Sequence, residues 1–445
     1  MKPSRPTTNQ GPLMPELLKL VRSSCESIPD PATRSVKFSI PDCIMSGIAM
    51  FELKYPSLLQ FDQDSHNDDV LIHNLQTLFG VNKAPSDTYF RQRLDPIDPY
   101  ALQHPMNQII NFLNDNKALV KYKYNVDPEE VNDPYLVSFD ATGTFSSHEV
   151  HCESCCVKHH KDGSVTYYHQ TLAAVMVCPN SKVVLPLAIE PITKQDGATK
   201  NDCEHNATKR LLVTLRENHP NKKMIIVMDG LYADGVIISL LKKLNFSFII
   251  TAKELDLKYL FDEYKFTKKE EFTTNHAKEP ELHYTFAEGI SLNDAHNEIK
   301  VNVLECIETK KDKKTRFCWI TNLSLAKKTA QRVALAARAR WKIENETFNT
   351  LKNQGYQFEH NFGHGLKNLG SVLSYLMFIT FLIDQVQQLC CKHFANSLIK
   401  CISKTRLWRK MYVYFSGHFI DTWEQLYLLI TGGLGSRASY LLNTS

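Results

Sequence analysis

One stretch decides the fold of this chain: SLAKKTAQRVALAARARWKIENETFNTLKNQG, residues 324–355. It contains no proline, and it predicts one long helix with Ser324 as the N-cap and Gly355 as the C′ stop. At about 100° per residue, Glu344 lies on the apolar face of this helix. The other residues of this face are Ala337, Arg340, Trp341, Phe348 and Leu351. A carboxylate on a buried face is costly unless it is paired or binds a metal. An i,i+4 pair with Arg340 and a metal site both remain open at this point.

Two further carboxylates follow short apolar runs. Residues 135–139 lead into Asp140, and residues 224–228 lead into Asp229. Each run predicts a buried strand with an aspartate at its C-terminal end, where open α/β sheets place their sites, although Asp is also common in turns. Three converging carboxylates, with Glu344 as the third, repel one another unless hard cations lie between them. The set therefore predicts two Mg²⁺ or Mn²⁺ ions and attack at a phosphodiester.

The helix also carries a recognisable motif. Arg340-Trp-Lys-Ile-Glu344, followed by Lys352, resembles the third-carboxylate signature of DDE transposases from bacterial insertion sequences. The subclass it resembles is the insertion sequence four family, whose helix bears a Tyr/Arg/Glu/Lys signature. Ala337 stands where that signature has Tyr, and Lys352 lies one residue farther from Glu344 than the signature asks. The resemblance extends to residues 85–95, PSDTYFRQRLD, and to residues 359–365, EHNFGHG.

The resemblance implies an α/β fold with an RNase H-like mixed sheet that cuts and joins DNA with two metal ions. It implies Asp140, Asp229 and Glu344 as the catalytic triad and metal ligands, with Arg340 and Lys352 on DNA phosphates. The expected partners are the terminal inverted repeats of the element and target DNA, with the protein as a dimer on DNA. Two alternatives share the same residues: an RNase H-like nuclease or resolvase without strand transfer, and an inactive transposase-derived DNA-binding protein.

Composition is compatible with a globular enzyme of several domains. The chain has 445 residues, of which 43% are hydrophobic and 22% charged. The N-terminus shows no signal peptide, and the longest apolar run, residues 372–383, is too short to span a bilayer and predicts a core helix. The twelve cysteines are expected to be reduced. These features predict a cytoplasmic protein, and the resemblance implies a bacterial one that joins the nucleoid when bound to DNA.

The pattern along the chain predicts six segments. The 115 residues between Asp229 and Glu344 exceed what one strand-to-helix connection needs, so an insertion is expected there. The predicted segments are a disordered start (1–14), a helical DNA-binding or accessory domain (15–130), a first part of the catalytic core (131–252), a β-rich insertion (253–323), a second part of the core (324–390), and a basic, helical C-terminal tail (391–445).

Basic residues indicate two candidate DNA contacts outside the triad. A helix that opens near Ser86 carries Arg91 and Arg93, which suits either a DNA-reading module or an accessory domain. Residues 391–445 hold seven Lys or Arg against two acidic residues, a net charge of +5, while the whole chain has +4. Four of these side chains are predicted to follow a phosphate backbone: Lys404, Arg406, Arg409 and Lys410. A solvated amphipathic helix is the alternative.

Cysteines and histidines form a second pattern. Cys152-x-x-Cys155 is one half of a zinc motif, and Cys203 is the candidate third ligand from a distance. Several histidines lie near these cysteines in sequence, among them His169. Structural Zn²⁺ and buried reduced thiols both remain open. His360 and His364, after the long helix, are expected to contact DNA or to form a satisfied turn.

Overall fold

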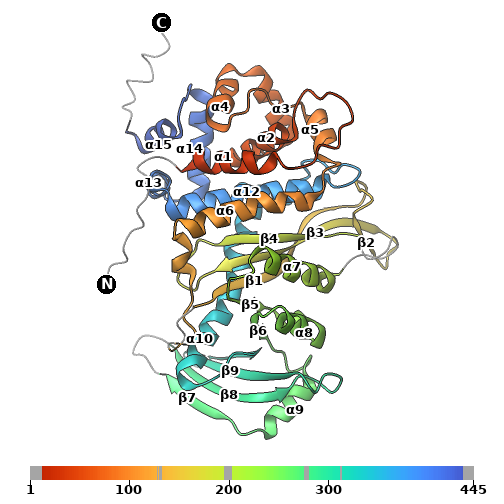
Figure 1. Ribbon diagram of the computed structural model, residues 1–445, viewed down its shortest axis with the longest axis vertical. Helices are drawn as coiled ribbons and strands as arrows, with labels where there is room; N and C mark the ends of the chain where they lie inside the picture. Colours follow the sequence, from red (N-terminus) through yellow and green to blue (C-terminus); the bar gives the residue numbers. More distant parts are fainter. Residues whose placement is uncertain are drawn as a thin grey trace.

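The computed structural model describes residues 13–127, 129, 133–194, 203–274, 280–310 and 313–433. The predicted disordered start therefore lies almost entirely outside the described residues, as does the end of the C-terminal tail. Within the described residues, ten strands form one sheet in the order β2-β3-β1-β5-β6-β10-β9-β8-β7, and β4 also pairs with β3. The edge strand β2 (Cys156–His159) pairs antiparallel with β3. Helices cover both faces and one end of this sheet (Figure 1).

The first half of the sheet lies within residues 131–252, the segment predicted as the first part of the catalytic core. β1 (Tyr135–Ser147) pairs antiparallel with β3 (Val165–Val177), which pairs antiparallel with β4 (Leu185–Ile192). On its other side β1 runs parallel to β5 (Met224–Met228), and β5 runs parallel to β6 (Ser247–Thr251). Three antiparallel strands followed by two parallel ones form an RNase H-like mixed sheet, so the predicted fold class is confirmed.

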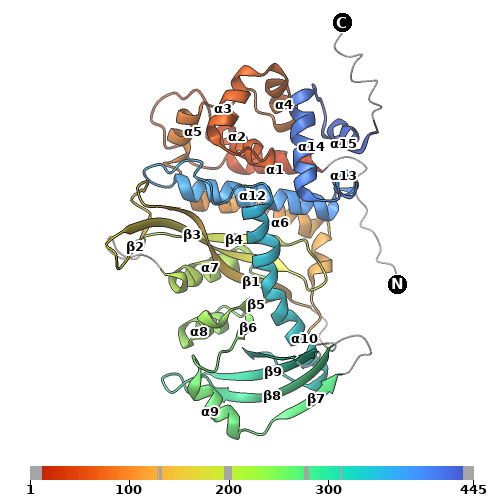
Figure 2. The same cartoon turned by 180° about the vertical axis from the view of Figure 1, so that it is seen from behind.

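The apolar runs explain why these strands are central. Every residue of β5 is buried, as is every residue of β4, because helices cover the sheet on both faces. α7 (Glu204–Asn218) and α8 (Gly235–Lys243) lie on the face that is in front in Figure 1. α10 (Lys327–Arg338) crosses the opposite face, which is in front in Figure 2.

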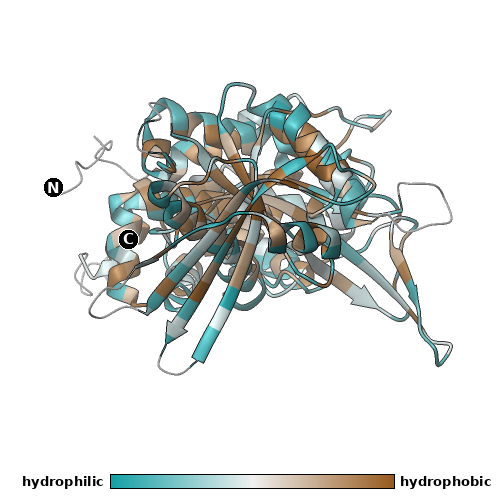
Figure 3. Cartoon of the chain, turned by 90° about the horizontal axis from the view of Figure 1, so that it is seen from below, coloured by the Kyte–Doolittle hydropathy of each residue, from teal (hydrophilic) through white to brown (hydrophobic). Residues whose placement is uncertain are grey.

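Residues between β6 and α10 extend the same sheet. β10 (Lys313–Thr321) pairs antiparallel with β6, and β9 (Lys300–Lys310), β8 (Glu281–Ser291) and β7 (Glu270–Thr274) follow outward. α9 (Lys258–Phe266) packs against β8. In Figure 3, which looks at this end of the molecule, brown segments gather at the centre and teal segments lie mainly at the periphery. Trp319 on β10 is 5% exposed, so it is a core residue of this region.

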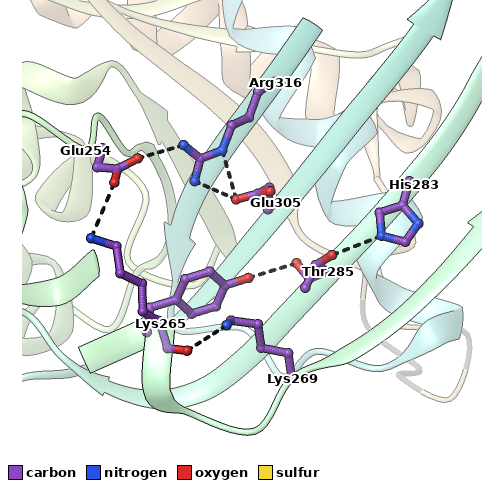
Figure 4. A network of polar contacts seen from close by, with 8 residues as sticks. Glu254, Lys265, Lys269, His283, Thr285, Glu305 and Arg316 are labelled. Carbon is purple, nitrogen blue, oxygen red and sulfur yellow. Dashed lines mark hydrogen bonds and ion pairs between the residues drawn. The ribbon is translucent and has the colours of Figure 1, made fainter. Parts of the chain in front are cut away.

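A polar network fastens α9 to these strands (Figure 4). Arg316 on β10 lies 2.7 Å from Glu305 Oε2 on β9 and 2.8 Å from Glu254 Oε2. Glu254 also faces Lys265 of α9 at 3.7 Å. These side chains are largely exposed, so the network orients the elements more than it stabilises them.

Two long helices separate the sheet from a helical layer. α12 (Leu369–Cys390) and α6 (Gln103–Asp115) lie side by side between β4 and the upper helices in Figures 1 and 2. α12 is long and apolar enough to cross a membrane, but 94% of its most apolar window is buried inside the protein. The predicted core helix is therefore confirmed, and a membrane protein is not indicated.

The upper layer combines both ends of the chain. Its N-terminal helices are α1 (Met14–Cys25), α2 (Ile40–Glu52), α3 (Leu58–Asn67), α4 (Asp69–Phe79) and α5 (Asp87–Leu94). Ser39 caps α2, accepting a hydrogen bond from the backbone N–H of Asp42 at 3.2 Å. Its C-terminal helices are α13 (Lys392–Cys401), α14 (Lys404–Gly417) and α15 (Trp423–Thr431). The Trp423 indole donates to the Leu78 carbonyl at 3.0 Å, so the predicted tail is a packed part of this layer.

The stretch 324–355 is helical but is not one uniform helix. After α10 come a 3₁₀ turn, η4 (Ala339–Trp341), a π-helical segment, η5 (Ile343–Phe348), and α11 (Asn349–Asn353). Ala326 occupies the N-cap position instead of Ser324. Gly355 follows the C-cap with φ +103°, so its predicted role as the C′ glycine is confirmed.

Candidate active site and a buried Cys/His cluster

Asp140 and Asp229 leave the sheet at the same level. The parallel pairing of β1 with β5 ends at Ser138 and Val227, and each aspartate lies two residues farther along its strand. β1 itself continues to Ser147 alongside β3, so the prediction that Asp140 ends its strand is wrong. The long antiparallel pairing with β3 keeps β1 extended after β5 has turned away. Equivalent residues on paired parallel strands lie on the same face, so this register supports the expected convergence of the two positions, which stays a prediction.

Glu344 reaches the sheet through Arg340. The Ser138 hydroxyl of β1 donates to the Arg340 carbonyl at 3.1 Å, which fixes the η4 turn on the sheet. The Arg340 guanidinium lies 2.7 Å from Glu344 Oε1 and 3.6 Å from Asp140 Oδ2. Its side chain is only 12% exposed. The i,i+4 pair considered from sequence is therefore present, and it is also the bridge between two of the three predicted catalytic carboxylates.

The predicted burial of Glu344 is wrong. Its side chain is 47% exposed and Trp341 is 48% exposed, whereas Ile343 and Thr347 are fully buried. The reason is local geometry, since a 3₁₀ turn and a π segment turn by different angles per residue from an α-helix. A uniform 100° step therefore misplaces Trp341 and Glu344, although Phe348 and Leu351 are buried as that step predicts.

The same π segment accounts for the position of Lys352. A π turn contains one residue more than an α-helical turn, so it absorbs the extra residue between Glu344 and Lys352. Lys352 Nζ lies 2.7 Å from Glu359 Oε1, at the start of the 359–365 segment. The one-residue departure from the signature is thus compensated by the helix itself, and the DNA contact of Lys352 stays a prediction.

Glu204 is a fourth carboxylate that the sequence did not reveal. It is the first residue of α7 and accepts a hydrogen bond from the Tyr232 hydroxyl, three residues after Asp229. Burial raises the pKa of Glu204, and the charge of Asp229 raises it further. The only sequence signal was an acidic residue at the start of a helix, which is common wherever helices begin.

Asp140 is surrounded by one cation and several carboxylates. Burial raises the pKa of Asp140 to about 7, Arg340 lowers it, and Glu344 and Glu204 raise it. One guanidinium therefore does not balance these carboxylates. Hard oxygen donors with uncompensated charge are what Mg²⁺ and Mn²⁺ prefer, so Asp140, Asp229 and Glu344 fit divalent cations as ligands.

The predicted DNA-binding arginines of α5 differ in their surroundings. Arg93 is 8% exposed and its guanidinium lies 2.7 Å from Asp30 Oδ2. It therefore forms a buried ion pair within the helical layer. Arg91 is 42% exposed and pairs with Asp87 at 2.7 Å. Of the two, Arg91 has the exposure that a phosphate contact requires.

The basic residues of α14 differ in the same way. Arg406 and Arg409 are exposed, while Lys410 is partly buried. Burial lowers the pKa of Lys404, and the charges of Asp384 and Glu346 act in the opposite direction. Lys404 therefore faces carboxylates of its own chain, including the one at Glu346.

A second cluster is formed by Cys152, Cys155, His169 and His364, whose ligand atoms all lie within 4.8 Å of one another. All four side chains are buried. Cys203, the predicted third zinc ligand, is exposed and does not join this group. The other two members of the cluster are His169 and His364. His169 lies on β3 beside the cysteines, and His364 lies in the 359–365 segment. His364 was predicted to contact DNA or to form a satisfied turn, and its 209-residue separation from Cys155 hid the pairing.

The sheet and its carboxylates define an RNase H-like domain of the kind that carries out phosphoryl transfer on nucleic acids. A sequence model of the family described as "Transposase DDE domain" matches residues 146–377. This match covers more than half of the chain, so the chain belongs to that family. The matched segment contains Asp229 and Glu344 and begins six residues after Asp140. No curated protein matches the chain.

Proposed function

We propose that this protein is a metal-dependent DNA transposase that cuts strands at the ends of an insertion sequence and joins the freed 3′-hydroxyls to target DNA. The observation that carries this proposal is the common level of Asp140 and Asp229 on paired strands, with Glu344 linked to Asp140 through Arg340. Membership of the transposase DDE family supports it. The insertion sequence four family is the subclass we propose, on the Arg340-to-Glu344 motif.

Each carboxylate has a defined task in this proposal. Asp140, Asp229 and Glu344 would hold two divalent ions, which when bound activate the attacking hydroxyl and stabilise the leaving oxygen. Glu204 lies behind this set, where its hydrogen bond from Tyr232 orients the turn that follows Asp229. Tyr232 is fully buried, so it positions this turn and does not contact DNA.

Arg340 supplies positive charge from the protein itself. The Ser138 hydroxyl holds the Arg340 backbone, and two carboxylates hold its guanidinium, so the side chain is preorganised at the site. A preorganised cation in a partly buried site stabilises charge that develops on a phosphate. Arg340 is therefore expected to contact the scissile phosphate once the carboxylates are neutralised by other cations.

The DNA partners extend beyond the catalytic site. We propose that the element's terminal inverted repeats contact the helical layer, with Arg91, Arg406 and Arg409 among the phosphate contacts, and that two copies act together on two ends. The exposed position of these three arginines supports this part of the proposal. The expected location of such an enzyme is the bacterial cytoplasm.

The decisive experiment uses the purified full chain and a DNA duplex that ends in the inverted repeat flanking the gene. Transposase activity predicts strand nicks at the repeat boundary and, with target DNA present, covalently joined products. Asp229→Asn should remove both products while leaving the folded state and the binding of the repeat intact. Hydrolysis without any joined product would favour a nuclease, and cleavage by Asp229→Asn would overturn the site assignment.

A further inference from the structure

The Cys/His cluster lies apart from the carboxylates and draws on three separated segments. Cys152 and Cys155 lie in the irregular segment 148–155 that follows β1. His169 lies on β3, at the register position of Phe145 on β1. His364 comes from the irregular loop 354–368 between α11 and α12. Four polar side chains thus meet where two segments without regular structure cross one strand.

The distances within the cluster match a tetrahedral metal site. Zn–S bonds of about 2.3 Å and Zn–N bonds of about 2.0–2.1 Å at tetrahedral angles place two sulfurs about 3.8 Å apart and a sulfur and a nitrogen about 3.5 Å apart. The Cys152 and Cys155 sulfurs are 3.8 Å apart, and His169 Nε2 lies 3.4 Å and 3.3 Å from them. His364 Nε2 lies 2.9 Å from the Cys155 sulfur, closer than a shared ion would leave it.

The environment also suits a bound ion. The exposed fractions are 7% for Cys152, 0% for Cys155, 6% for His169 and 9% for His364, so water reaches little of the cluster. The backbone N–H of Cys152 donates to the Cys155 sulfur at 3.4 Å, so the chain between the two cysteines already folds around this sulfur. Two sulfur and two imidazole ligands in a tetrahedral arrangement are typical of zinc.

We propose that Cys152, Cys155, His169 and His364 bind one Zn²⁺ ion in a closed, structural site. Four protein ligands fill a tetrahedral shell, so no position remains for a water or for DNA. The ion would fasten the 354–368 loop to the segment that follows β1. A hydrogen bond from the Ser154 hydroxyl to the Lys367 carbonyl at 2.9 Å already joins the same two segments.

This linkage connects the elements that carry two of the three proposed catalytic carboxylates, Asp140 and Glu344. Asp140 lies on β1, which leads into the cysteines, and Glu344 lies on the helical stretch that leads into the His364 loop. Zinc binding therefore stabilises the relative position of β1 and the catalytic helix. The inference does not depend on the proposed DNA chemistry, because metal content and stability are measurable without any substrate.

The first test is the metal content of the full chain, purified without chelator or histidine tag from zinc-supplemented cells. About one zinc per chain is expected by elemental analysis. The double variant Cys152→Ser/Cys155→Ser should lose nearly all of it, whereas Cys203→Ser, which alters an exposed cysteine outside the cluster, should retain it. Zinc-free wild-type protein, or equal zinc in all three proteins, would overturn the proposal.

Cobalt gives a second test that needs no variant. Metal-free wild-type protein with reduced thiols, titrated with Co²⁺, should develop the visible bands of tetrahedral cobalt and thiolate charge-transfer absorption, and Zn²⁺ should remove them. A zinc chelator should lower the Tm of the wild-type protein and of Cys203→Ser, and leave the Tm of His364→Gln unchanged. A colourless cobalt titration, or a Cys152–Cys155 disulfide in its place, would contradict the zinc site.

Discussion

Asp140 and Asp229 lie at the same level of two neighbouring parallel strands, each two residues beyond the last pair, Ser138 and Val227. Neighbouring strands are about 4.8 Å apart, so this register brings two carboxylates to one edge without any loop to place them. The third carboxylate depends on a helix, and the Ser138 hydroxyl fixes that helix by its bond to the Arg340 carbonyl. Ser138 thus belongs both to the strand pair that aligns the aspartates and to the contact that positions Glu344.

The first prediction separates Glu344 from Glu346. Glu344 pairs with Arg340, which also faces Asp140, whereas Glu346 acts electrostatically on Lys404 of α14. Glu344→Gln should therefore abolish strand cleavage, and Glu346→Gln should keep most of it. Both proteins should bind the terminal repeat and melt like the wild type, since both side chains are at least partly exposed. An active Glu344→Gln protein beside an inactive Glu346→Gln protein would reverse the assignment.

The second prediction concerns the catalytic cations. Cleavage should require Mg²⁺ or Mn²⁺, while Ca²⁺ should support DNA binding without cleavage, because it accepts the same oxygen ligands in a looser geometry. The measurement is a cleavage assay on protein freed of Mg²⁺ and Mn²⁺, with each ion added separately. Zinc in the Cys/His cluster must be retained in this experiment, so the protein is dialysed against a weak chelator. Full cleavage in that chelator with no added ion would refute the requirement.

The sequence predicted the core because burial there leaves a simple pattern. Continuous apolar runs marked β1 and β5 and the helix of residues 372–383, and each became a buried element. The face of Glu344 was not predictable in this way, because the π segment η5 has no marker in the residue pattern. Glu204 and the His169–His364 pair depend on contacts between distant segments. Periodicity within one element says nothing about such contacts.

The third prediction tests the basic surface of α14. Deleting residues 391–445 would remove the buried Trp423 and Phe415, so truncation confounds binding with folding. Arg406→Gln/Arg409→Gln removes two exposed charges instead, and it should weaken binding to all DNA sequences alike. The slope of log K against log salt should fall by about 2.

The matched control removes two exposed lysines from the other end of the molecule, as Lys243→Gln/Lys258→Gln on α8 and α9. Its salt slope should stay closer to that of the wild type. Equal losses in the two double variants would show that the α14 arginines have no special role in binding DNA.

The fourth prediction is a loss of stability in mild acid caused by His219. Burial, with Lys222 and Arg216 nearby, lowers the pKa of His219 to about 4, while the unfolded value is about 6.5. A lowered pKa means that the unfolded chain binds the proton first, so stability is present above pH 6.5 and is lost as the pH falls toward 4. Between pH 7 and pH 5 the loss amounts to about 2 kcal/mol.

Urea unfolding at both pH values measures this loss. His219→Gln should reduce the difference by about that amount, whereas His104→Gln, at an exposed position, should leave it unchanged. Comparing variant with wild type also removes the contribution of Asp140, whose raised pKa has the opposite effect on stability. An unaltered pH dependence in His219→Gln would show that this imidazole titrates normally.

The last prediction concerns Asp95, at the end of the 85–95 motif, and the residues that directly follow the 359–365 motif. The Asp95 carboxylate accepts backbone N–H bonds from Leu366, Lys367, Asn368 and Leu369 at 3.0–3.1 Å, where α12 begins. Asp95→Ala leaves the N–H groups of Leu366, Lys367 and Leu369 without their acceptor, while the Asn368 N–H keeps the Asp95 backbone carbonyl at 3.2 Å. The variant should lower the free energy of unfolding by about 3 kcal/mol. Asp98→Ala removes a single cap on Tyr100 and should cost about 1 kcal/mol. Urea unfolding of both variants measures these losses in the free energy of unfolding. Equal losses would mean that Asp95 does not hold the His364 loop to α5.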